Sequence, residues 1–144
     1  MKSSTWLRVL AVVLGLFALG HTVGTAAPKV TRGVRERIVF SAMQGYQFPV
    51  MGFDRSYWDF YRGFALTISV LMVVMAVVAW QLAEVSRRNP RAALPMAVTL
   101  LVGSVGLLVL GLEFFFAAPI LFSGVAVGVA GWVVVLLRRE TRRM

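Results

Sequence analysis

The stretch GFALTISVLMVVMAVVAWQLA, residues 63–83, contains no charged side chain. About 20 consecutive apolar residues are needed for a helix to cross the hydrocarbon core of a bilayer. Three further windows of at least 20 residues also lack charge: 9–28, 92–112 and 114–137. The 144-residue chain is 59% hydrophobic, whereas soluble domains contain roughly 45–50% apolar residues. We therefore predict one all-α domain, residues 1–144: an integral membrane four-helix bundle with spans at about 6–27, 60–83, 92–113 and 118–138.

Composition excludes several classes of protein. The chain has no Cys and a single His, His21, so we expect no thiolate or histidine-cluster metal site and no cofactor. No nucleotide-binding or metalloprotease motif occurs. The net charge of +9 is typical of nucleic-acid binding, but basic residues that flank apolar windows set topology and contact anionic lipids instead. We predict membrane lipids as partners, and no nucleic acid.

The first apolar window resembles a signal peptide, because GTAA at residues 24–27 offers a small-residue cleavage site. Two features favour a retained helix. The uncharged window is long enough to span a bilayer, and Pro28 directly follows the candidate site at Ala27.

Basic residues are unevenly divided between the two sides that four spans define. The side with both termini carries nine: Lys2, Arg8, Arg87, Arg88, Arg91, Arg138, Arg139, Arg142 and Arg143. The other side carries six: Lys29, Arg32, Arg35, Arg37, Arg55 and Arg62. Positive charge marks cytoplasmic loops, so both termini are predicted to be cytoplasmic. The preference for Arg over Lys is typical of a GC-rich bacterial genome, which indicates the bacterial inner membrane.

The connections between the spans differ in length. In the first loop, Val30, Val34, Ile38 and Ala42 recur every four residues between charged residues. This spacing predicts a short interfacial helix over residues 30–45; an irregular loop is the alternative. QGYQFPVMGFD, residues 44–54, should then return the chain through Gly and Pro turns. Asn89-Pro90 predicts a tight turn, and Pro119 suits the first turn of the last helix.

Small residues indicate where helices touch. Gly20 and Gly24 form one GxxxG pattern, Gly124 and Gly128 form another, and Gly103 and Gly106 lie in the third span. We expect a homodimer or a larger membrane complex to form through Gly124 and Gly128.

The second span opens with RSYWDFYRGF, residues 55–64. Ser56 and Asp59 match a capping box, in which each side chain bonds the other residue's backbone N–H. Asp59 and Arg62 are three residues apart and can pair on one helix face. Tyr57, Trp58 and Tyr61 would lie at headgroup level, so a purely anchoring role for this segment is one interpretation.

The other interpretation is a site on the outer side, where the span count brings the end of the first span, the start of the second and the end of the third together. An ionisable residue inside a span needs a partner, and for His21 we expect Glu113 or the Asp59–Arg62 pair. His21, Glu113 and Asp59 are the catalytic candidates. The ligand-binding candidates are His21, Thr22, Tyr57, Asp59, Tyr61, Arg62 and Glu113. Alternatively, His21 bonds a helix neighbour and only fixes packing. Glu84 and Glu140 lie among Arg residues and are interpreted as surface charges.

Two motifs carry a resemblance: GHTVGT at residues 20–25 and RSYWDFYRGFAL at residues 55–66. With these motifs the chain resembles a group of uncharacterised small bacterial four-helix membrane proteins, and in size and span count it is similar to the DoxX-like superfamily. The resemblance implies a fold and no reaction. The signature positions it implies are His21, Thr22, Gly24, Arg55, Ser56, Asp59, Tyr61 and Gly63.

Three functions remain open from the sequence. The first, which we favour, is a membrane protein that binds a lipid, quinone or other small apolar molecule in a pocket at the outer side, or acts as an accessory subunit. The second is a small membrane enzyme that uses a His–carboxylate pair for proton transfer, as an isomerase or quinone-linked oxidoreductase. The third is a proton-coupled carrier, disfavoured because the middles of the spans contain no ionisable residue.

Overall fold

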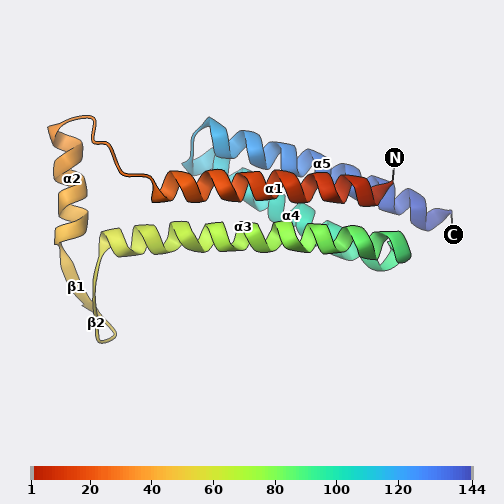
Figure 1. Ribbon diagram of the computed structural model, residues 1–144, viewed down its shortest axis with the longest axis horizontal. Coiled ribbons are helices and arrows are strands. Elements are labelled where there is room, and N and C mark those ends of the chain that lie inside the picture. The colour runs from red at the N-terminus through yellow and green to blue at the C-terminus, as the bar shows by residue number, and fades with distance from the viewer. Residues whose placement is uncertain (1, 144) are drawn as a thin grey trace. The chain divides into compact units, whose positions relative to one another are not determined.

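The structure is a computed structural model that describes residues 2–143. Its elements in chain order are α1 (Ser3–Ala26), α2 (Val34–Gly45), β1 (Gln47–Val50), β2 (Phe53–Ser56), α3 (Tyr57–Arg88), α4 (Pro90–Phe114) and α5 (Ala117–Arg142) (Figure 1). Four of these helices, α1, α3, α4 and α5, are long and apolar enough to cross a membrane. The predicted helical architecture is therefore confirmed, and each predicted span corresponds to one of the four helices.

The helices extend beyond the predicted spans because charged residues continue them. α3 covers 32 residues and ends at Arg88. Glu84 in its last turns forms salt bridges with Arg87 at 3.3 Å and with Arg88 at 3.2 Å. Such pairs at spacings of three and four stabilise a helix, and Arg near a helix C-terminus favours the helix dipole. A prediction that counts only uncharged residues ends such a helix too early.

The chain divides into two compact units, and we describe each by itself. The first, which we call the four-helix unit, comprises Met1–Ala18 and Leu71–Met144. The second, which we call the hairpin unit, comprises Leu19–Val70. Both α1 and α3 contribute one segment to each unit.

The core of the four-helix unit is built from large side chains on three helices. On α1, Leu7, Leu10 and Leu14 are at most 1% exposed, at spacings that place them on one face. They belong to one buried cluster with Leu82 of α3 and Leu137 of α5. Burial of each such side chain stabilises the fold by about 1.5–3 kcal/mol when the alternative is contact with water.

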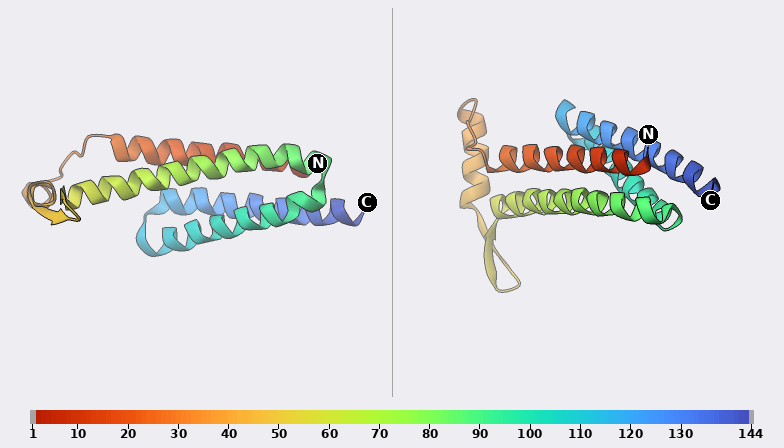
Figure 2. Two further views of the ribbon diagram at one scale, coloured as in Figure 1. Left: turned by 90° about the horizontal axis from the view of Figure 1, so that it is seen from below. Right: turned by 45° about the vertical axis from the view of Figure 1, so that its right-hand side comes forward.

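The seam between α4 and α5 is built from small side chains. The two helices lie side by side in both figures (Figures 1 and 2). Ala93 and Ala97 of α4, and Ala126 and Ala130 of α5, are at most 2% exposed. Spacings of four residues place each pair on one helix face, and small residues there let two backbones approach closely.

The glycine pattern predicted these contacts only in part. A Cβ built on Gly103 would lie 3.2 Å from Cε of Met75, so this glycine does mark a close approach. At Gly20, Gly24, Gly106, Gly124 and Gly128 an added Cβ meets no atom within 4 Å in the described chain. The inference that Gly24 admits a neighbouring helix is therefore wrong for this structure. At the α4–α5 contact the glycine is Gly111, where an added Cβ would lie 3.6 Å from side-chain atoms of Ile120 and Ser123. A dimer through Gly124 and Gly128 stays a prediction.

Local capping rules explain the turn between α3 and α4. Asn89 is the N-cap residue, and its Oδ1 accepts a hydrogen bond from the backbone N–H of Ala92 at 3.0 Å. Pro90 follows at the first helical position, where its missing N–H costs nothing. The predicted Asn89-Pro90 turn is confirmed, as is the placement of Pro119 in the first turn of α5.

The hairpin unit contains a helix that the sequence predicted and two strands that it did not. α2 begins at Val34, after the extended Gly33, so residues 30–33 of the predicted helix lie outside it. β1 and β2 pair antiparallel, with Gln47 opposite Ser56 and Val50 opposite Phe53. Met51 and Gly52 between them have φ of 50° and 89°. A two-residue loop with positive φ at both positions matches the right-handed twist of paired strands.

We expect the α4–α5 seam to resist enlargement. Replacing Ala130, which is 1% exposed, with Leu should lower the free energy of unfolding by about 1–3 kcal/mol, because a packed interface has no room for the added carbons. Val125→Leu is the control, since Val125 is 52% exposed and should change stability little. Thermal unfolding in detergent measures both, and equal melting temperatures for the two variants would contradict this account of the seam.

Candidate functional site

The single histidine has a serine as its partner. Nδ1 of His21 lies 3.0 Å from Oγ of Ser69, which belongs to α3 and is 6% exposed. The Ser69 hydroxyl also lies 3.4 Å from the carbonyl oxygen of Ala65, a second acceptor for its hydrogen. Both residues belong to the hairpin unit. The expectation that a polar partner stabilises His21 is thus met, but the partner is a hydroxyl and not an acid.

The two acids expected beside His21 are placed differently. Oδ2 of Asp59 accepts hydrogen bonds from the backbone N–H and the hydroxyl of Ser56, both at 2.9 Å. Glu113 lies exposed near the end of α4, in the other unit, so a pair between His21 and Glu113 stays a prediction. The structure shows Nδ1 of His21 bonded to Ser69 and not to Asp59; a link between His21 and the Asp59–Arg62 pair through one water stays a prediction.

Ser56 and Asp59 form the predicted capping box. Besides the bonds that Asp59 accepts from Ser56, the backbone N–H of Asp59 donates to Ser56 Oγ at 3.2 Å. Ser56 is only 4% exposed. The cap satisfies backbone donors at the start of α3 that would otherwise have no partner. Among the described residues Asp59 and Arg62 form no close salt bridge, but the positive charge of Arg62 still acts on the Asp59 carboxylate, so the predicted pairing holds only as a longer-range attraction.

Aromatic rings join the hairpin to the start of α3. Tyr57 lies 4.9 Å from Phe48 and 6.1 Å from Tyr46, measured between ring centroids. Phe48 also stacks on Phe60 at 6.0 Å. The other predicted ligand-binding tyrosine, Tyr61, stacks on Trp58 at 5.3 Å. Tyr57 and Tyr61 remain about half exposed; their ring contacts organise the hairpin unit, and a role in ligand binding stays a prediction for both, as it does for Thr22.

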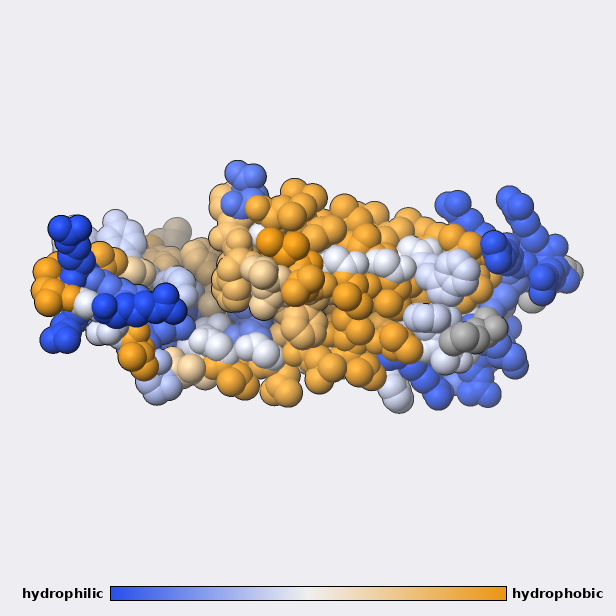
Figure 3. Space-filling view, turned by 90° about the horizontal axis from the view of Figure 1, so that it is seen from above, coloured by the Kyte–Doolittle hydropathy of each residue, from blue (hydrophilic) through white to orange (hydrophobic). Residues whose placement is uncertain are grey.

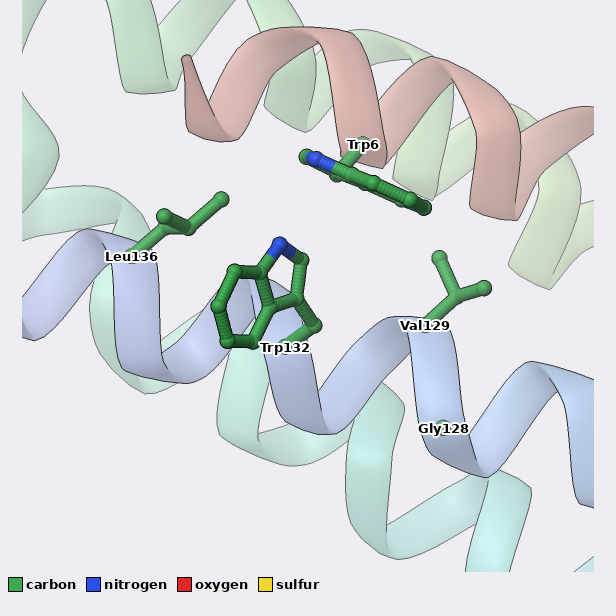
Figure 4. A pocket seen from close by; sticks show the side chains of 5 residues that line it. All are labelled: Trp6, Gly128, Val129, Trp132 and Leu136. Atoms are coloured by element: carbon green, nitrogen blue, oxygen red, sulfur yellow. The ribbon is translucent and has the colours of Figure 1, made fainter. Parts of the chain in front are cut away.

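A cavity of about 400 Å³ lies in the four-helix unit, between α1 and α5. Figure 4 shows the indoles of Trp6 and Trp132 facing each other across it, with Val129 and Leu136 on either side. Gly128 contributes bare backbone to its wall. The lining residues of α5 are spaced by three and four, so they share one helix face. The lining is almost entirely apolar, and the cavity is open on one side and not enclosed.

One lining residue of the cavity has a polar atom without a partner. The indole N–H of Trp6 is shielded from solvent and donates to no acceptor in residues 2–143. Such a donor costs free energy unless a ligand or water accepts from it. No sequence motif includes Trp6 or Trp132, so this cavity was not predicted from the sequence. The signal that could have indicated it is the presence of two Trp residues at the ends of spans that the topology brings to one side.

The two ends of the chain are held together by a carboxylate. Glu140 accepts hydrogen bonds from the backbone N–H of Ser3 at 3.0 Å and from its hydroxyl at 2.6 Å. Ser3 begins α1 and is 1% exposed. A carboxylate at a helix N-terminus is favourable because the N–H groups there lack partners and the dipole is positive. Glu140 therefore has a structural function, and its interpretation as an ordinary surface charge is wrong.

Among residues 2–143, no three His, Asp or Glu side chains come together in a way that could hold a metal ion. Comparisons with protein-family models, with curated proteins and with solved structures find no match to this chain.

We expect His21 and Ser69 to be energetically coupled. His21→Ala and Ser69→Ala should each destabilise the protein, and the double variant should lose less than the sum, by about 1 kcal/mol for the shared hydrogen bond. Thermal unfolding of the three variants measures the coupling. Thr67→Ala with His21→Ala is the control pair, since the Thr67 hydroxyl donates to Gly63 of its own helix at 2.9 Å. Strict additivity of the His21 and Ser69 variants would contradict the pairing.

Proposed function

We propose that this is an integral protein of the bacterial inner membrane, with both termini in the cytoplasm, that binds a small apolar molecule with a hydrogen-bond acceptor. A lipid or a quinone has this chemistry. The observation that carries the proposal is the apolar cavity of about 400 Å³ between two indoles, one of which, Trp6, has a buried N–H without an acceptor in residues 2–143.

The surface supports membrane insertion. Large apolar side chains are exposed along the four long helices: Val12 and Leu16 are both 54% exposed, Leu71 is 58% and Leu121 is 67%. Figure 3 shows hydrophobic residues covering much of the visible surface, with hydrophilic residues gathered outside this apolar region. Soluble monomers rarely expose apolar patches of this extent. In a bilayer the same side chains contact lipid, and the helices satisfy their own backbone polar groups.

The shape and chemistry of the cavity support the class of ligand. Two indole rings, Val129 and Leu136 form the apolar wall. A carbonyl oxygen of a quinone or of a lipid ester would accept from the Trp6 N–H, which then gains a bond that it lacks within the chain. This proposal places the ligand at the end of the four-helix unit that holds the termini. The sequence had favoured the outer side, and a second pocket there with His21 and Glu113 stays a prediction.

Binding should depend on the Trp6 N–H. Calorimetric titration of the detergent-solubilised protein would compare a short-chain benzoquinone and a fatty-acid methyl ester with tetramethylbenzene, which has no acceptor. Wild type should prefer the carbonyl compounds by about fivefold, the equivalent of one hydrogen bond of about 1 kcal/mol. Trp6→Phe should lose this preference. Trp80→Phe is the control, because Trp80 carries Arg8 over its ring and does not line the cavity.

Filling the cavity should abolish binding of both carbonyl compounds. Gly128 is exposed and a Cβ there meets nothing within 4 Å, so Gly128→Leu should fold with its side chain in or beside the cavity. Gly124→Leu, one turn away and outside the lining, is the matched control for ligand binding. Both variants should also disturb the predicted dimer, so they test that prediction as well. Unchanged binding in Gly128→Leu would exclude the cavity as the site.

The orientation has its own test. A reporter fused after residue 144 should be active in the cytoplasm, because nine basic residues flank the helices on that side and six on the other. Fusions after Lys29, in the first loop, should report the periplasm. Activity of the C-terminal fusion only in the periplasm would overturn the orientation and leave the cavity proposal untouched.

A second candidate function is a small membrane enzyme that transfers protons, as an isomerase or a quinone-linked oxidoreductase. The observation in its favour is the His21–Ser69 contact of 3.0 Å, since a hydroxyl within reach of an imidazole is an arrangement used to activate nucleophiles and move protons. The test is quinone-linked oxidoreductase or isomerase activity of the purified protein. If both His21→Gln and Ser69→Ala abolish this activity while benzoquinone binding is unchanged, the enzyme is favoured over a protein that only binds its ligand.

A further inference from the structure

A second cavity in the four-helix unit, of about 270 Å³, is lined by polar and basic residues: Lys2, Ser4, Thr5 and Arg8 of the first turns of α1 and the segment before it, and Arg87 of the last turn of α3. Three of its five lining side chains are cationic and two are hydroxyl donors. No carboxylate lines it. This composition contrasts with the apolar Trp6 cavity, whose lining contains no charge.

The acids near this end are already occupied. Glu84 accepts from Arg87 at 3.3 Å and from Arg88 at 3.2 Å. Glu140 accepts from the backbone N–H and hydroxyl of Ser3. Because Glu140 already takes the first N–H of α1, the attraction for an anion comes mainly from the basic side chains and not from the helix end. Glu84 is shared by Arg87 and Arg88, so it does not neutralise both arginines, and the cavity has an excess of positive charge.

Arg8 is held in place without being neutralised. Its guanidinium carbon lies 5.4 Å from the ring centroid of Trp80, a cation–π contact. In the part of the chain that the structure describes, neither Arg8 nor Lys2 forms a salt bridge. A guanidinium whose flat face lies on an aromatic ring can still donate hydrogen bonds from the N–H groups at its edge. Two of these N–H groups can donate in parallel to two oxygens of a phosphate.

We infer that this cavity binds a phosphate group, with Lys2, Arg8 and Arg87 as cationic partners and Ser4 and Thr5 as hydroxyl donors. Two sources share that chemistry: the phosphodiester of an anionic phospholipid and free phosphate. Basic pockets between membrane helices on the cytoplasmic side are suited to anionic headgroups. The lipid source rests on the membrane placement proposed above, whereas the phosphate site itself does not, and it is separate from the Trp6 cavity.

The test uses two variants of equal charge. The cavity variant combines Lys2→Gln, Arg8→Gln and Arg87→Gln. The control variant combines Arg91→Gln, Arg138→Gln and Arg143→Gln, which also removes three positive charges near the helix ends on the side of the termini but changes no lining residue and no partner of one. Native mass spectrometry of the full chain in a non-ionic detergent counts bound phosphatidylglycerol, with phosphatidylcholine as the uncharged comparison. Melting temperatures show whether each variant is folded.

We expect wild type and the control variant to retain phosphatidylglycerol, and the cavity variant to bind it at least about tenfold more weakly, the equivalent of losing one hydrogen bond to a charged group. Lys2→Gln alone, at an exposed residue, should weaken binding with no change in melting temperature. This single variant keeps the test decisive if the triple variant does not fold. Equal losses in the cavity and control variants would show diffuse attraction to surface charge and overturn the site.

Inorganic phosphate separates the two sources. If it raises the melting temperature of wild type but not of the cavity variant, and phosphatidylglycerol does not bind selectively, the site holds free phosphate. Selective phosphatidylglycerol binding that phosphate competes away only weakly identifies the lipid. Absence of both effects overturns the phosphate site, while the benzoquinone titration still decides the Trp6 cavity independently.

Discussion

The four-helix unit depends on the close approach of α4 and α5. Ala93 and Ala97 of α4 and Ala126 and Ala130 of α5 are almost fully buried and belong to one cluster. Ser104 and Ser123 are also fully buried, but their hydroxyls bond carbonyls of their own helices, at 2.8 Å and 2.7 Å. Small side chains and internally satisfied hydroxyls remove the two obstacles to close contact, bulk and unpaired polar groups. The leucines of α1 and α3 complete the core.

Polar chemistry in this unit is concentrated near the termini. Glu140 caps α1 across 137 residues of sequence, Arg8 rests on Trp80, and Arg139 lies 6.0 Å from the ring centroid of Trp132. The first two turns of α1 contribute to both cavities, with Trp6 lining the apolar one and Ser4 and Arg8 the basic one. Ser4 and Arg8 are four residues apart and therefore share a helix face. Trp6 is two residues from each of them and lies on a different face. One helix end thereby contributes to two different surfaces, one apolar and one basic.

The hairpin unit is organised by ring contacts and by local capping. Ser56 ends β2 and also caps α3, so one residue joins the strand pair to the long helix. The rings of Tyr46 and Phe48 then pack on Tyr57. The His21–Ser69 bond connects α1 to α3 in the same unit.

The sequence by itself determined the four long helices, the turn at Asn89-Pro90, the short helix in the first loop and the Ser56–Asp59 cap. Each depends on residues close together in the chain: uncharged windows, a proline at the first helical position, an apolar repeat, or two side chains three apart. Only the tertiary structure decided the partners of His21 and Glu140, which lie 48 and 137 residues away. It also decided the two cavities and the alanine seam. These features require knowing which helix faces meet, and side chains that satisfy a His or a carboxylate are too common in any sequence to be selected without that geometry.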